Sequence, residues 1–157
     1  MKKIMIVEDD KIVAKELFNL LINSDYEAII LEDFENAKDV ILKSNPDLIL
    51  LDINIPYING ELLLKGLRKE SNIPIIMLTS RTSETDEVLS MSYGADDYIT
   101  KPFRATILIA KINAILERRN AILGEAGQTK KSSNDQPTDA EIAQAVKTLA
   151  KVGINPL

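Results

Sequence analysis

The sequence contains no cysteine and no histidine among its 157 residues. The absence of cysteine excludes disulfide bonds and thiolate chemistry. The absence of histidine removes the commonest general base and metal ligand, and with it any phosphohistidine chemistry supplied by this chain. Any chemistry must therefore come from carboxylates, hydroxyls and lysines.

The sequence also lacks a long apolar run. No stretch approaches the roughly 20 residues that a membrane span needs, and the short IMIV run after Met1-Lys2-Lys3 is too short for a signal-peptide core. We therefore expect a cytoplasmic protein with no membrane contact. The net charge of −5 argues against a nucleic acid as the partner of the whole surface.

Short apolar runs alternate with segments of helical period along the chain. The runs predict strands at residues 3–7, 27–31, 47–51, 74–78 and 97–99. Helices are expected at about 10–23, 33–43, 61–70, 83–92 and 104–120, with Asp33 capping the second. Five strands alternating with five helices predict a parallel sheet covered by helices on both faces.

Polar residues stand where the predicted strands end. In parallel sheets the carboxyl ends of the strands meet at one edge, which is where ligands bind. The residues expected to converge there are Glu8 and Asp9 after the first strand, Asp52 at the end of the third, Thr79 after the fourth, and Lys101 after the fifth.

Carboxylates gathered at one edge repel each other and need compensation. A hard divalent ion such as Mg²⁺ supplies it, because Mg²⁺ takes oxygen ligands. Together with Lys101 and the Thr79 hydroxyl, such an ion would form a clamp for the oxygens of a transferring phosphoryl group. Asp52 is a competent nucleophile for that transfer and would give an aspartyl phosphate.

Four motifs carry a family resemblance: VEDD, LLDINIP, MLTS and GADDYITKPF, in this order. Over roughly residues 1–121 the chain resembles the receiver domain of two-component response regulators. The last motif is most similar to the OmpR-type subfamily, whose members usually carry a winged-helix DNA-binding domain. The resemblance implies a flavodoxin-like, doubly wound (βα)5 α/β fold with a five-stranded parallel sheet of order 2-1-3-4-5.

The resemblance also implies roles for single residues. Asp52 would be the phosphoacceptor, and Asp9 would bind Mg²⁺ directly while Glu8 acts through water. Asn54 would offer its backbone carbonyl to the metal. A sensor histidine kinase would be the donor, and the chain would catalyse only its own phosphorylation and slow dephosphorylation, which is not conventional enzyme activity.

The phosphoryl group would be held by Thr79 and Lys101, and Tyr98 matches the aromatic residue that turns inward when Thr79 moves. The peptide bond between Lys101 and Pro102 matches one that is typically cis in this family. Asp10 is expected to serve only as the acidic start of the first helix. Asp96 is expected to be solvated or salt-bridged, away from the catalytic edge.

The resemblance further suggests a homodimer through the fourth helix, fifth strand and fifth helix. Asp97 and Lys111 match one ion pair of such dimers. A second pair is missing, because Ile107 stands where an acid or base opposite Glu87 is expected. The dimer is therefore a hypothesis.

The C-terminal part differs in composition. All three glutamines follow residue 123, and four lysines balance four acidic residues there. We interpret residues 122–137 as a flexible linker and 138–157 as a short amphipathic helix that begins with the capping box TDAE. One interpretation is a receiver joined to foreign or vector-encoded residues. The other is a natural single-domain regulator whose tail docks on the receiver or a partner.

The leading functional hypothesis is a Mg²⁺-dependent phosphorylation switch that controls a transcriptional output domain absent from this chain. Two alternatives are a stand-alone receiver acting through protein–protein interaction and an aspartyl-phosphate phosphatase of the haloacid dehalogenase type. The phosphatase needs a second aspartate two residues after the nucleophile, and Asn54 occupies that place.

Overall fold

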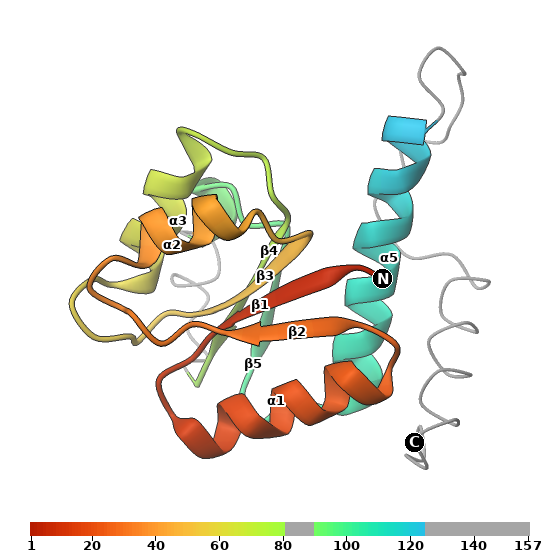
Figure 1. Ribbon diagram of the computed structural model, residues 1–157, viewed down its shortest axis with the longest axis horizontal. Helices are drawn as coiled ribbons and strands as arrows, with labels where there is room; N and C mark the ends of the chain where they lie inside the picture. The colour runs from red at the N-terminus through yellow and green to blue at the C-terminus, as the bar shows by residue number, and fades with distance from the viewer. Residues whose placement is uncertain (81–89, 125–157) are drawn as a thin grey trace. The chain divides into compact units, whose positions relative to one another are not determined.

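The computed structural model describes residues 1–80 and 90–124 (Figure 1). It contains five strands: β1 Lys3–Val7, β2 Glu27–Ile30, β3 Leu48–Asp52, β4 Ile75–Thr79 and β5 Asp97–Thr100. The helices within the described residues are α1 Lys11–Asn23, α2 Ala37–Ser44, α3 Gly60–Arg68 and α5 Ala105–Gly124. The strands form one parallel sheet in the order β2-β1-β3-β4-β5, which confirms the expected topology.

Alternate residues of the central strands point to opposite faces of the sheet. Met5, Ile49 and Met77 belong to one buried cluster, and this cluster also contains apolar residues of α2 and α3. Figure 1 shows α2 and α3 on one face of the sheet and α1 on the opposite face. Helices on both faces explain why every residue of β3 and β4 is buried.

Two helix boundaries differ from the sequence-based expectation by four residues. The prediction that Asp33 caps the second helix was wrong, because α2 begins at Ala37 and Asn36 is its N-cap residue. The Asp33 carboxylate accepts a hydrogen bond from the Asn36 N–H (3.2 Å) in the turn that precedes α2. The last helix is longer than expected, since α5 continues to Gly124.

Residues Met1–Phe103 form one compact unit that holds the whole sheet and every predicted site residue, whereas α5 belongs to a second unit. The linker and tail predicted beyond residue 124, and most of the helix predicted at 83–92, lie outside the described residues. Among the described residues, no helix is long and apolar enough to cross a membrane.

Candidate functional site

Asp52 is the last residue of β3 and is buried despite its charge. A buried carboxylate is stable only when hydrogen bonds or opposite charges compensate it. Its Oδ1 accepts a hydrogen bond from the backbone N–H of Asn54 at 3.1 Å. Its Oδ2 accepts one from Nζ of Lys101 at 3.0 Å. The position at the end of the strand makes both contacts possible.

Lys101 follows β5 and reaches carboxylates at the ends of β1 and β3, neither of which is a neighbour of β5 in the sheet. Besides Asp52, its ammonium group donates to Oε1 of Glu8, the residue that follows β1. The other oxygen of Glu8 accepts the backbone N–H of Asp10 at 3.1 Å. A single lysine therefore contacts two buried carboxylates, one directly after β1 and one at the end of β3.

These contacts act on the ionisation of both partners. Burial and the neighbouring Asp52 carboxylate raise the pKa of Glu8, and the hydrogen bonds from Lys101 and from the Asp10 N–H offset this rise only in part. Burial alone would lower the pKa of Lys101, but its hydrogen bonds to Glu8 and Asp52 and the negative charges of both together outweigh that effect, so the pKa is raised. Lys101 is thus held as a cation at the site.

Glu8, Asp9 and Asp52 form an acidic cluster whose carboxylate oxygens all lie within 4.8 Å of one another. The oxygens around one octahedral Mg²⁺ lie about 3 to 4.2 Å apart, so small side-chain shifts would bring the three within range of one ion. The donor set consists of oxygens only, which suits a hard cation. The cluster therefore fits a divalent metal.

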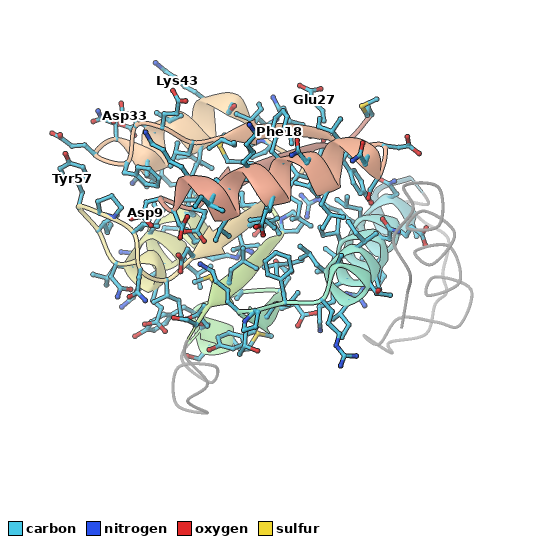
Figure 2. All side chains as sticks on the ribbon, turned by 90° about the horizontal axis from the view of Figure 1, so that it is seen from below. Asp9, Phe18, Glu27, Asp33, Lys43 and Tyr57 are labelled. Atoms are coloured by element: carbon cyan, nitrogen blue, oxygen red, sulfur yellow. The ribbon has the colours of Figure 1, made fainter. Side chains whose placement is uncertain are left out.

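The exposed Asp9 opens the cluster to solvent. It lines a hollow of about 510 Å³ together with Asn54 and the rest of the β3–α3 loop, residues 53–59. Figure 2 shows Asp9 beside the start of α1, on the same side of the molecule as Tyr57 of that loop. A small ligand can reach the acidic cluster from this side.

Thr79 lies on β4, the neighbour of β3, and Tyr98 lies on β5, the next strand of the sheet. Thr79 ends β4 and is fully buried, and its carbonyl accepts the backbone N–H of Lys101 at 2.6 Å. Tyr98 pairs with Met77 across the two strands and packs partly buried against the core cluster. The structure thus brings Glu8, Asp9, Asp52 and Lys101 together and places Thr79 at the end of the strand beside β3, whereas Tyr98 lies two residues before the end of β5. The individual roles of these residues stay predictions.

Three other expectations are confirmed. Asp10 caps α1, because its Oδ1 accepts the N–H groups of Ile12 (3.0 Å) and Val13 (3.3 Å). The peptide bond between Lys101 and Pro102 is cis. Asp96 forms a salt bridge, at 2.9 Å, with Arg68.

Sequence reasoning missed two features of this unit. It did not predict the direct contact between Glu8 and Lys101, for which no local pattern exists because the residues are far apart in sequence. It also assigned no role to Arg68, because the expectation of a solvated or salt-bridged Asp96 named no partner for the salt bridge.

Comparison with known proteins identifies the arrangement. Residues 4–113 match the family described as the response regulator receiver domain. The chain belongs to this family. Its curated relatives are OmpR-type response regulators, as the GADDYITKPF motif indicated.

Relatives of the receiver domain come from several bacteria. The chain is 40% identical over 130 residues to the sensory transduction protein BceR of Halalkalibacterium halodurans, covering 83% of this chain and 56% of that protein. It is 41% identical over 118 residues to the transcriptional regulatory protein YxdJ of Bacillus subtilis, covering 75% of this chain and 52% of that protein. The chain thus spans about half the length of these curated relatives.

A solved receiver domain shows the same fold. The BeF3-activated N-terminal receiver domain of RstA from Klebsiella pneumoniae superimposes with a TM-score of 0.70 at 36% identity, covering 73% of this chain and 97% of that one. The expected homodimer is not tested by these similarities, and Glu87 of its proposed interface lies outside the described residues.

Proposed function

We propose that this receiver domain is a Mg²⁺-dependent switch that accepts a phosphoryl group on Asp52 from a sensor histidine kinase. The observation that carries the proposal is the contact of a buried, strand-end carboxylate with a single lysine, beside two further carboxylates. Family membership supports it, because receivers of response regulators are phosphorylated by sensor histidine kinases.

In the proposed transfer, a carboxylate oxygen of Asp52 forms a bond to the phosphorus of the donor phosphohistidine. The P–N bond breaks, and its electron pair returns to the donor imidazole, which takes up a proton. Lys101 stands 3.0 Å from Asp52 and places a fixed positive charge beside the phosphoryl oxygens. Thr79 at the adjacent strand end would donate its hydroxyl to the same group, and Tyr98 would follow its movement.

Asp9 and Asp52 would hold Mg²⁺ through their carboxylates, Glu8 would act through water, and Asn54 would offer its backbone carbonyl. The bound ion supplies positive charge that offsets the negative charge of the phosphoryl oxygens. Hydrolysis of the aspartyl phosphate by water would return the protein to its initial state.

The output is proposed at the level of the whole protein. YxdJ is named a transcriptional regulatory protein, and this chain covers only about half of its length. Both observations favour a transcriptional regulator of which this chain would be the receiver domain. The switch would then act by changing the face around β5, through which a homodimer could form.

Incubation with acetyl phosphate and Mg²⁺, followed by intact-mass measurement, tests the proposal. We expect a gain of one phosphoryl group, which disappears in Asp52→Asn and without Mg²⁺. The matched control is Asp39→Asn, an exposed carboxylate in the first turn of α2, which should be phosphorylated like the unaltered protein. Phosphorylation that persists in Asp52→Asn would contradict the assignment, and release of many phosphates per protein would favour a phosphatase.

A further inference from the structure

Arg68, the last residue of α3, contacts both connections that lead into β4 and β5. Its Nη1 donates to the carbonyl of Ile73 (2.7 Å), just before β4. Its Nε donates to the carbonyl of Gly94 (2.8 Å), and its Nη2 forms the 2.9 Å salt bridge with Asp96, just before β5. The planar guanidinium group suits such divergent contacts better than an ammonium group would.

The two strand starts are also joined directly. The backbone N–H of Asp96 donates to the carbonyl of Ile75 at 2.8 Å. In return, the backbone N–H of Ile75 donates to Oδ2 of Asp96 at 2.8 Å, the oxygen that Arg68 contacts. Arg68, Asp96 and Ile75 therefore form a closed clamp at the edge of the sheet opposite to the acidic cluster.

Gly94 adapts the chain to this clamp. It has a positive φ of 106°, and a Cβ atom there would lie 2.9 Å from Cγ of Arg68. A larger residue would therefore displace the arginine side chain. The glycine at this position lets the arginine cross over the turn.

Further contacts lie on the same face of α3. Residues spaced by three or four positions share one face of a helix. Glu61 accepts a hydrogen bond from the buried Ser90 Oγ at 3.3 Å, and Nζ of Lys65 lies 5.4 Å from the centre of the Tyr93 ring. One face of α3 thus contacts residues 90–96, the described segment that leads into β5.

The position of β5 depends on few contacts within the sheet. It is four residues long and pairs with β4 alone, because it is the edge strand. A slip by one residue would move the chain by about 3.3 Å and turn every side chain to the other face. A slip of that size would break the 3.0 Å contact between Lys101 and Asp52.

We propose that Arg68 is a positioning residue for the phosphorylation site, acting through the register of β5 on Lys101. This inference rests on the proposed phosphorylation of Asp52. The carboxylates proposed to bind the metal lie on or after β1 and β3, whereas the Arg68 side chain contacts the segments that lead into β4 and β5. Loss of the clamp should therefore impair the step that needs Lys101 and spare the affinity for Mg²⁺.

The test measures two quantities on the same variants: the rate of phosphorylation by acetyl phosphate at saturating Mg²⁺, per folded protein, and the Kd for Mg²⁺. In Arg68→Met we expect the rate to fall about tenfold, since small misplacements of a reacting group cost at least that much. The affinity for Mg²⁺ should not fall, because no proposed ligand is altered and a displaced Lys101 would take a positive charge away from the carboxylates. Asp96→Ala removes the other partner of the salt bridge and should behave alike.

Lys38→Met is the matched control. Lys38 also forms an ion pair near the end of α3, but its partner is Glu70 (2.6 Å), which lies on neither β4 nor β5. It should leave both quantities unchanged. An unchanged rate in Arg68→Met and Asp96→Ala, or a parallel loss of rate and Mg²⁺ affinity, would overturn the positioning role. Failure of the unaltered protein to be phosphorylated would instead overturn the proposed function.

Discussion

Lys101 compensates the charge of Glu8, directly after β1, and of Asp52, at the end of β3; both carboxylates are almost entirely buried. Removing one partner of a buried ion pair leaves an uncompensated charge, which costs more than the pair contributed. The lysine is therefore expected to matter for folding as well as for phosphoryl transfer.

In Lys101→Met we expect the free energy of unfolding, without Mg²⁺, to fall by about 3 kcal/mol. Urea unfolding followed by circular dichroism would measure it. Phosphorylation by acetyl phosphate should be lost in the same variant.

The double variant Lys101→Met with Glu8→Gln tests the cause. Because glutamine carries no charge, it should restore part of the lost stability without restoring phosphorylation. A double variant that is less stable than Lys101→Met would show that charge compensation is not the reason.

The residues of the site could be predicted because their sequence positions carry the information. Glu8, Asp52, Thr79 and Lys101 each stand at the end of an apolar run, and a parallel sheet brings such ends together. Their pairing could not be predicted in the same way. Whether Lys101 contacts one carboxylate or two depends on side-chain positions, which sequence spacing does not determine.

At the scale of the elements, the start of α3 packs closely against the end of β3. A Cβ atom on Gly60 would lie 2.2 Å from the carbonyl oxygen of Asp52 and 2.7 Å from Cα of Ile53. The Gly60 N–H also donates to the Ile53 carbonyl at 2.7 Å. The helix can approach the acceptor strand this closely only because residue 60 has no side chain.

Gly60→Ala should lower the free energy of unfolding by about 2 kcal/mol or more, because the backbone atoms it would meet cannot move aside cheaply. Thermal unfolding would measure the loss. We expect phosphorylation to slow as well, since Asp52 is part of the displaced backbone.

Gly66→Ala in the same helix is the control. Its Cβ atom would meet only Cδ of Lys38, at 3.7 Å, and alanine favours helix over glycine by up to about 1 kcal/mol. This variant should be as stable as the unaltered protein or more so. Equal effects of the two substitutions would contradict the close-packing explanation.

Strands were easier to predict than helix starts. Apolar runs of the buried strands are unambiguous, and Asp52 ends β3 as expected, whereas Thr79 is the last residue of β4 and was expected directly after it. The start of α2 was misplaced because Asp33 has the chemistry of a cap but accepts hydrogen bonds from Asn36 in the preceding turn. Aspartate favours caps and turns alike, so composition alone does not distinguish them.

At the scale of the molecule, the carboxylates of the acidic cluster repel one another, and a bound cation would reduce this repulsion. Three carboxylates and one lysine meet there. A ligand that binds only the folded chain stabilises it by an amount set by its concentration relative to Kd. The cluster should therefore couple Mg²⁺ to the stability of the fold.

At a Mg²⁺ concentration of 100 times Kd, the free energy of unfolding should rise by about 2.7 kcal/mol. Chemical unfolding with and without the ion would measure the increase, and a chelator should reverse it. In Asp9→Asn, which removes the exposed carboxylate of the cluster, a given Mg²⁺ concentration should stabilise less. Equal stabilisation of both proteins would show that the ion acts elsewhere.

The sheet order also has a consequence for how the site opens with time. β1 and β3 each lie between two strands, whereas β5 has a single strand neighbour. Edge strands take part in local opening more readily than central ones. Amide hydrogens of β5 should therefore exchange with solvent earlier than those of β1 and β3. In a local opening of the sheet, Lys101 should leave the site while the carboxylates at β1 and β3 stay in place.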